Sequence, residues 1–159
     1  ADKISINSIA YDNPKIINEA SIKFGSQAIT VSIDVKKINN EYICFYNCGK
    51  KISDKNFYDH LKECEDRGAG EIIINSISHD GLLEGYDYEL IKKCTSSLNI
   101  PVVAAGGAGD YDHFLKAYES GANAFAASSI YHFTQSTPAQ IKKYLVKKSV
   151  PIRENFIID

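Results

Sequence analysis

The sequence lacks the patterns of membrane-spanning and low-complexity proteins. No apolar run approaches the roughly 20 residues that a helix needs to cross a bilayer. With 10 glycines, 4 prolines and 44% hydrophobic residues among 159, the chain also lacks the composition of a collagen-like or disordered protein. The first residues, ADKISINSIAYD, lack the basic and apolar segments of a signal peptide. We therefore expect a folded cytoplasmic protein that does not bind membranes.

An excess of basic charge is also missing. The chain has 18 basic and 20 acidic residues, for a net charge of -2, and its lysine pairs are spread along its length. A nucleic-acid-binding protein usually carries a clustered basic surface, so we predict no nucleic acid partner. Arginine occurs only at Arg67 and Arg153. A bound phosphate would therefore be held mainly by backbone N–H groups rather than by bidentate arginines.

The four cysteines do not form a metal-binding pattern. Cys44 and Cys48 are four residues apart, but Cys64 and Cys94 make no second close pair, and no histidine lies at zinc-finger spacing. We interpret these residues as buried or free thiols in a reducing compartment. The sequence thus predicts neither a metal ion nor another cofactor.

Strand-like and helix-like segments alternate along the chain. Strands are expected at 3–6, 28–35, 71–76, 101–105 and 122–127, and helices at 14–24, 55–67, 87–97, 110–120 and 138–147. The alternating segment 41–47, which ends near Gly49, predicts a hairpin ahead of the second helix. Five such strand–helix units indicate an α/β protein with a parallel sheet. No linker-like segment divides the chain, so we predict a single domain over residues 1–159.

The periodicity alone leaves the type of parallel fold open. No GxGxxG string follows a strand, which argues against a dinucleotide-binding fold. A flavodoxin-like sheet could be built from five strands. A (β/α)8 barrel usually needs about 250 residues, so this chain could supply only part of one.

Polar and glycine residues gather where the expected strands end, which is where parallel α/β proteins place their sites. The GGAG segment Gly106–Gly109 and the pair Ser128-Ser129 follow neighbouring strands. Glycines let the backbone approach an anion, and serines add hydroxyl donors. Gly106, Gly107, Ser128 and Ser129 therefore predict a phosphate site, with a plain tight turn as the alternative for the glycines.

Two aspartates are the other candidates, and the histidines are not. Asp34 ends an apolar strand and could act as a general acid or base, or simply pair with a neighbouring lysine. Asp80 precedes Gly81, a common turn pair, in a polar loop. His60 and His113 are expected on helix surfaces, and no histidine joins a metal-ligand pattern.

Six segments, in order along the chain, closely resemble the cyclase subunit of imidazole glycerol phosphate synthase. They are ADKISINS, FGSQAITVSIDVKK, RGAGEIIINSISHDG, EGYD, IPVVAAGGAG and AASSIYHF. The resemblance covers nearly the whole chain and implies the parallel (β/α)8 TIM-barrel fold of that family. This chain would form a partial barrel with about strands 4–8, and the first three βα units have no counterpart in it.

The resemblance implies a lyase of histidine biosynthesis. Family members receive ammonia from a glutaminase subunit, with which they form a heterodimer. The ammonia reacts with a phosphorylated ribulosyl-formimino aminoimidazole nucleotide and yields imidazole glycerol phosphate and aminoimidazole carboxamide ribotide. A glutaminase subunit and a phosphorylated small molecule are therefore the expected partners.

Functional residues of the family match positions of this sequence. Asp34 matches one of two aspartates that act as general acid and base, and Asp80 matches a further active-site aspartate. The second acid–base aspartate lies on the missing first strand, so this chain alone is expected to cyclise poorly. The phosphate sites match Gly81, Gly107 and Ser129 on one side of the barrel mouth and Asn7 and Ser8 on the other, and an ammonia gate at the opposite end matches Lys3 and Glu71.

Three departures from the family pattern leave a related activity open. Leu82 stands where a phosphate-binding threonine is expected, Ser78 replaces an aspartate and Ala105 replaces a serine. These changes would remove hydrogen bonds worth about 0.5–1.5 kcal/mol each. They favour cyclase-like paralogues that accompany surface-glycan genes and pass ammonia to a sugar- or nucleotide-linked substrate.

A reading of a different class is a non-catalytic one. Five of eight units would expose two open sheet edges and the apolar lining of a barrel, and such surfaces associate readily. Under this hypothesis the chain is an inactive half-barrel-like fragment that self-associates through its open edges.

Overall fold

The computed structural model describes residues 1–153 and contains a seven-stranded sheet. The sheet order is β4-β3-β2-β5-β6-β7, and β1 pairs with the first residues of β2, ahead of the part of β2 that pairs with β3. The strands span Ile4–Ile6 (β1), Ile29–Ile38 (β2), Glu41–Tyr46 (β3), Lys51–Ile52 (β4), Glu71–Ser76 (β5), Val102–Ala105 (β6) and Ala124–Phe125 (β7). β1, β2, β5, β6 and β7 are parallel, whereas β3 and β4 pair antiparallel. The five expected parallel strands and the expected hairpin are thus confirmed.

A helix follows each parallel strand, as the sequence predicts. The helices span Ile9–Asp12 (α1), Lys15–Phe24 (α2), Phe57–Asp66 (α3), Tyr88–Ser97 (α4), Tyr111–Glu119 (α5), Ser129–Phe133 (α6) and Pro138–Lys147 (α7), and a 3-10 turn covers Ser26–Ala28. Side-chain caps fix several N-terminal boundaries, because an oxygen there accepts from otherwise unpaired backbone N–H groups. Asn56, Asp87, Asp110 and Thr137 cap α3, α4, α5 and α7 in this way.

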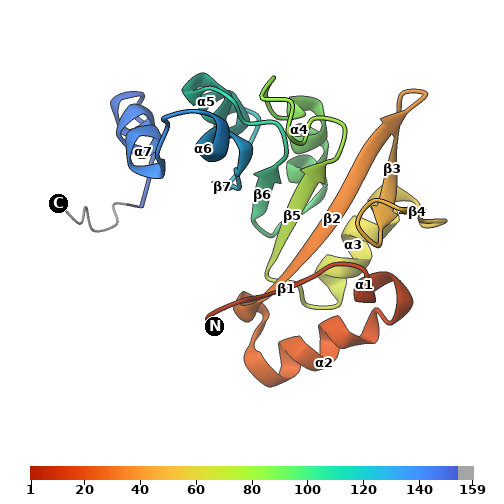
Figure 1. Ribbon diagram of the computed structural model, residues 1–159. Coiled ribbons are helices and arrows are strands. Elements are labelled where there is room, and N and C mark those ends of the chain that lie inside the picture. The colour runs from red at the N-terminus through yellow and green to blue at the C-terminus, as the bar shows by residue number, and fades with distance from the viewer. Residues whose placement is uncertain (154–159) are drawn as a thin grey trace.

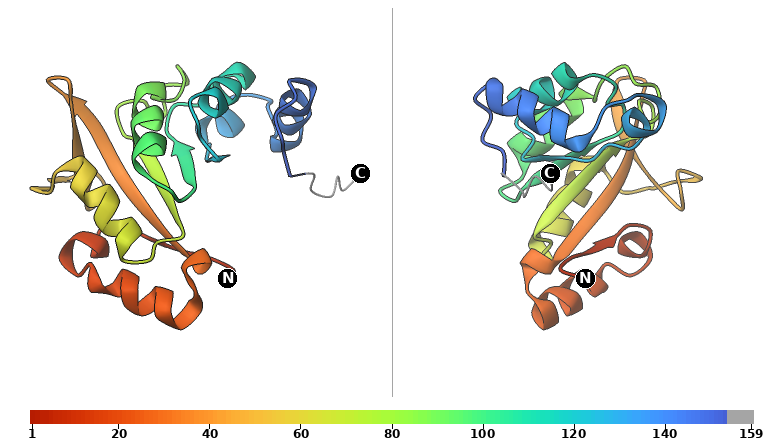
Figure 2. Two further views of the ribbon diagram at one scale, coloured as in Figure 1. Left: turned by 180° about the vertical axis from the view of Figure 1, so that it is seen from behind. Right: turned by 60° about the vertical axis from the view of Figure 1, so that its left-hand side comes forward.

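The sheet is open rather than closed into a barrel. Figure 1 shows β2, β5 and β6 side by side, with β7 and the C-terminal helices at one end and β1 with α2 at the other. Seen from behind, α3 and α4 lie in front of β2 and β5 and cover one face of the sheet (Figure 2). This arrangement is that of part of a (β/α)8 barrel, in which helices cover only the outer face.

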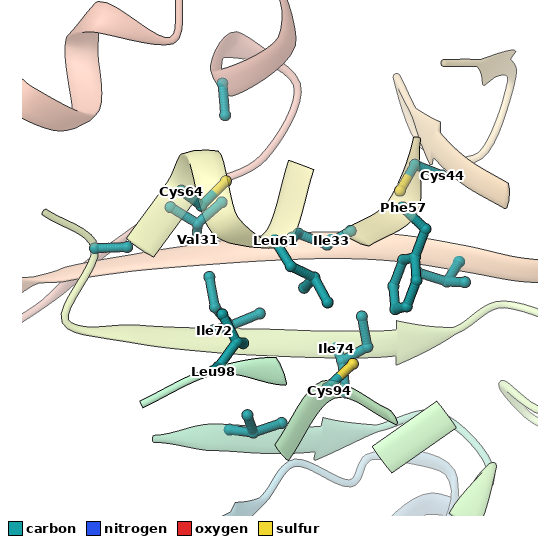
Figure 3. Close-up of a cluster of buried hydrophobic side chains, with 14 of the residues drawn as sticks. Val31, Ile33, Cys44, Phe57, Leu61, Cys64, Ile72, Ile74, Cys94 and Leu98 are labelled. Atoms are coloured by element: carbon teal, nitrogen blue, oxygen red, sulfur yellow. The ribbon is translucent and has the colours of Figure 1, made fainter. Parts of the chain in front are cut away.

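The apolar core lies between this outer face and the helices. Val31 and Ile33 of β2 and Ile72 and Ile74 of β5 point toward Leu61 of α3, and all five are buried (Figure 3). Because successive strand residues point to opposite faces, the residues between them face the other side of the sheet. Burial of the core side chains, at about 25 cal/mol per Å² of apolar surface, holds helices and sheet together.

The inner face carries polar residues in rows set by the strand register. Thr30 pairs with Glu71, and Asp34 pairs with Asn75. Asn75 in turn pairs with Ala105 of β6. Residues in register point to the same face, so one polar row lies at the amino end of the strands and another at the carboxyl end.

Two expectations are corrected in detail. The strand expected at 122–127 is formally only Ala124–Phe125, because its remaining bonds to β6 are irregular: Asn123 binds Val102 through both its backbone and its side chain. Residues 154–159 lie outside the described residues. A single domain over 1–159 stays a prediction.

His60 is buried rather than exposed on a helix surface, which corrects the second expectation. Its side chain is 1% exposed. The ring centres of His60 and Tyr11 are 4.2 Å apart, and Cys64 Sγ lies 3.9 Å from His60 Nδ1. Burial, with the nearby charge of Lys55, lowers the pKa of His60 to about 4 from an ordinary 6.5. The imidazole is therefore neutral in the folded protein at neutral pH.

His60 should make the fold sensitive to acid. Its pKa is lower in the folded than in the unfolded chain. The neutral His60 therefore leaves the free energy of unfolding undiminished above pH 6.5, and that free energy declines as the pH falls toward 4. The shift corresponds to a loss of about 3 kcal/mol. We expect His60→Phe to flatten this part of the curve of unfolding free energy against pH, measured by denaturant titration. The exposed His132→Asn is the matched control and should leave the slope unchanged; an equal slope in both variants would contradict the assignment.

Candidate functional site

A pocket of about 300 Å³ opens at the carboxyl ends of β5, β6 and β7. Five of the predicted site residues line it together, namely Asp80, Gly106, Gly107, Ser128 and Ser129. The remaining lining residues are Ser32, Ile73, Asn75, Ala105, Ala108, Ala126 and Ala127. The wall is thus made mostly of small residues, hydroxyls and backbone, together with Ile73, Asn75 and the exposed carboxylate of Asp80.

The glycines of the pocket are sterically required. Gly106 and Gly107 have φ angles of 85° and 107°, which side-chain-bearing residues rarely adopt. A Cβ atom on Gly106 would lie 2.7 Å from the carbonyl oxygen of Ser76, and one on Gly107 would lie 2.1 Å from that of Gly85. The loop is therefore a tight turn that also forms part of the pocket wall, and phosphate binding by it stays a prediction.

Neighbouring loops hold the pocket together. The Gly85 N–H donates to the Gly107 carbonyl oxygen over 2.8 Å. The buried Tyr86 hydroxyl donates to the Ala126 carbonyl oxygen over 3.1 Å. Because Ala126 also lines the pocket, the segment after β5 fixes the walls contributed by both β6 and β7.

Contrary to the prediction from the sequence, Asp34 does not end its strand, because β2 continues to Ile38 through its pairing with β3. Two amides hold its carboxylate. Asn75 Nδ2 donates to Asp34 Oδ1 over 3.0 Å, and Asn7 Nδ2 donates to Asp34 Oδ2 over 3.2 Å. The lysine pair next in sequence does not take this role, since Lys37 pairs with Glu89 at 2.6 Å. Asn75 also lines the pocket, so it connects the carboxylate of Asp34 to the glycine and serine wall.

Asn7 and Ser8 belong to the Asp34 cluster and are not among the pocket's lining residues. Ser8 Oγ donates to Asn7 Oδ1 over 3.1 Å and accepts from the Asn47 backbone N–H over 2.9 Å. The turn between β3 and β4 is thereby connected to the amide that holds Asp34. Phosphate binding by Asn7 and Ser8 remains a prediction.

Asp80 and Gly81 form a turn beside the pocket. The backbone N–H groups of His79 and Asp80 both donate to the Ser76 carbonyl oxygen over 3.0 Å. His79 Nδ1 lies 2.8 Å from Ser76 Oγ, which fixes the imidazole against the end of β5. Gly81 has open space around it, with no atom within 4 Å of a Cβ position.

Lys3 and Glu71 meet at the opposite end of the sheet. Lys3 Nζ lies 2.6 Å from Glu71 Oε2, and Thr30 Oγ donates to Glu71 Oε1 over 2.7 Å. Partial burial alone would raise the pKa of Glu71, but the hydrogen bonds from Lys3 and Thr30 and the charge of Lys3 outweigh it and lower that pKa. Glu71 is therefore an anion paired with a cation at neutral pH.

The described residues offer no metal centre. Among residues 1–153, no three or more His, Cys, Asp or Glu side chains are placed to hold a metal ion. The four cysteines are free, and burial raises the pKa of the Cys44 thiol to about 11. No helix in the part of the chain that the structure describes is long and apolar enough to cross a membrane.

Three residues of the site were not selected as site residues from the sequence. Asn75 ends β5 in the inner row, and its register with Asp34 was the signal that could have identified it. Ser32 lies two residues before Asp34 on the same face of β2. Tyr86 belongs to the EGYD segment, and its hydroxyl contact with Ala126 could not be inferred from spacing.

The chain is similar to known proteins over nearly its full length. It is 45% identical over 96% of its residues to imidazole glycerol phosphate synthase subunit HisF of Campylobacter concisus. The corresponding subunits of a Thermotoga species and of Sulfurisphaera tokodaii are 42% and 44% identical, again over 96% of this chain. The chain spans about 60% of the length of these curated relatives.

A match to a protein family extends over most of the same region. Residues 1–137 match the family described as "Histidine biosynthesis protein". That stretch contains the clamped Asp34, the glycine loop and both serines of the pocket. The sheet order, the pocket at its carboxyl end and this match agree, and the chain belongs to the histidine biosynthesis protein family.

Proposed function

We propose that the protein containing this chain is the cyclase subunit of imidazole glycerol phosphate synthase. It would use ammonia from a glutaminase subunit to convert a phosphorylated formimino nucleotide into imidazole glycerol phosphate and aminoimidazole carboxamide ribotide. Three buried free thiols, Cys44, Cys64 and Cys94, support a reducing cytoplasmic location. The names of the relatives support this histidine-pathway function over a role in surface-glycan synthesis.

One observation carries the proposal: the pocket and the clamped carboxylate lie at the same end of the sheet and share Asn75. A phosphorylated substrate needs an anion site, and ring closure needs a group that transfers protons. Asn75 brings these two features within one side chain of each other. This is where parallel α/β proteins bind their ligands.

In the proposed reaction Asp34 transfers protons at the substrate. Both of its carboxylate oxygens accept hydrogen bonds, from Asn7 and Asn75, which fixes the orientation of the group. A catalytic group works best when its neighbours hold it in one geometry. Asp80, exposed at the pocket rim, would be a second carboxylate near the substrate.

The phosphate would be held largely by backbone. Gly106 and Gly107 bring main chain to the pocket wall, and Ser128 and Ser129 add hydroxyls. Leu82 is 55% exposed nearby and offers no donor where the family has a threonine. The donors that remain are backbone N–H groups and serine hydroxyls. These neutral groups can bind a phosphate in place of arginine side chains, of which this chain has few.

Ammonia would arrive from the end of the sheet opposite the pocket. There Lys3 forms an ion pair with Glu71, which also accepts a hydrogen bond from Thr30. This ion pair would be the counterpart of the family's gate. Opening it would require breaking a contact that is half-exposed on the Lys3 side, with 50% exposure, so the energy involved is small. This placement supports a glutaminase subunit docking at the amino ends of the strands.

The role of Asp34 can be tested in the full-length gene product with ammonium as the nitrogen donor. We expect Asp34→Asn to lower turnover of the formimino nucleotide by at least about 100-fold, the usual contribution of a general acid or base. Asp54→Asn, an exposed aspartate in the loop before α3, is the matched control and should keep full activity. Undiminished turnover in Asp34→Asn would refute the assignment, and inactivity of the unaltered protein would refute the proposed reaction.

The close approach of the glycine loop can be tested with two alanine variants. Gly107→Ala combines a strained φ of 107° with a backbone clash, whereas Gly81→Ala at φ 82° meets open space. We expect Gly81→Ala to cost about 1–2 kcal/mol of unfolding free energy and Gly107→Ala about 1–3 kcal/mol more. Denaturant unfolding measures both. Equal losses would show that the space around Gly107 is larger than the structure indicates.

A further inference from the structure

We propose that His113 is a positioning residue of the phosphate pocket, which it serves by holding the glycine loop from behind. Its Nδ1 accepts hydrogen bonds from the backbone N–H groups of Gly109 and Asp110, each over 3.2 Å. The inference rests on the proposed function, because the loop that it holds forms the wall of the proposed phosphate site.

The loop is anchored on both sides of Ala108, the last of its pocket-lining residues. On one side the Gly107 carbonyl oxygen accepts from the Gly85 N–H over 2.8 Å. On the other side His113 accepts from Gly109 and Asp110. Between these anchors lies Ala108, which is buried and lines the pocket. The backbone of residues 107–109 therefore cannot turn without breaking one of the two attachments.

The contact of His113 with Gly109 goes beyond ordinary helix capping. The cap of α5 is Asp110, whose side chain accepts from the Asp112 N–H over 2.8 Å. His113 reaches back to the Asp110 N–H, as the third residue of a capping box does. It also binds Gly109, which lies outside the helix and belongs to the loop. The second bond gives the side chain a role in the loop itself.

The imidazole packs among the same segments that confine the loop. His113 Cδ2 would lie 3.5 Å from a Cβ atom placed on Gly85. A Cβ atom on Gly109 would lie 2.1 Å from the Leu83 carbonyl oxygen. The ring, the segment 83–85 and the glycine loop are thus stacked in close contact. The Gly109 N–H is part-buried and the Asp110 N–H lies at an exposed position, so the bond to Gly109 is the one for which water can least easily replace the acceptor.

The chemistry requires an unprotonated Nδ1. A neutral imidazole that accepts at Nδ1 carries its proton on Nε2. Asparagine can supply a carbonyl oxygen near the position of Nδ1, whereas glutamine places its oxygen one bond farther out. Leucine has a similar volume and no acceptor. Substitution by asparagine, glutamine or leucine therefore distinguishes the effect of the hydrogen-bond acceptor from the effect of side-chain volume.

The experiment compares His113→Asn, His113→Leu and His113→Gln in this chain, with inorganic phosphate as the probe. NMR titration gives the phosphate affinity, and amide hydrogen exchange reports on the Gly109 and Asp110 N–H groups. We expect His113→Leu and His113→Gln to lose protection at these two amides and to bind phosphate about tenfold more weakly. His113→Asn should keep both properties close to those of the unaltered chain.

Several outcomes would overturn the inference. Unchanged phosphate affinity in His113→Leu, or equal losses in the asparagine and leucine variants, would show that the acceptor does not position the loop. If the leucine variant does not fold, the polar glutamine variant provides the same comparison. If the unaltered chain does not bind phosphate, the phosphate site itself is refuted. Protection of the Gly109 and Asp110 amides in that chain would then show that the contact with His113 is present all the same.

Discussion

The parallel register between β2 and β5 is the constraint on which the rest of the structure depends. It pairs Thr30 with Glu71 at one end and Asp34 with Asn75 at the other. Because these residues share the inner face, one register sets both the ion pair with Lys3 and the amide clamp on Asp34. A slip of β2 by one residue would move Thr30 and Asp34 into the apolar layer under the helices, away from Glu71 and Asn75. The apolar core on the outer face therefore fixes the register that places these polar side chains on the inner face.

The proposed phosphate pocket would hold an anion with little help from arginine, since the chain has only two. Its walls are backbone and small side chains, and the positive φ angles of Gly106 and Gly107 allow the loop to approach its neighbours closely. Close approach leaves few ways for the loop to move. Gly85 and His113, neither of which lines the pocket, connect the loop to the surrounding segments, and Tyr86 holds Ala126 on the neighbouring wall. Specificity here depends on the order of the backbone as much as on the residues that face the ligand.

Much of the fold was predictable because strand and helix periodicities are local. The alternating segments gave the parallel strands, and α7 begins at Pro138 and ends at Lys147 as the sequence predicted. His60 was assigned to a surface although it lies four residues before Cys64, on the apolar side of α3. Asn75 and Asp34 are 41 residues apart in the sequence and lie on different strands, so only the register of the sheet reveals that they pair.

The central claim is that a phosphate binds where the glycine loop and the serine pair meet, beside the amide that holds Asp34. A crystal structure of the protein with inorganic phosphate tests it most directly. The expected result is a phosphate within hydrogen-bonding distance of the Gly107 backbone and of Ser129, in the pocket that Asn75 lines. A phosphate bound only by surface lysines, with the pocket empty at saturating phosphate, would contradict the claim.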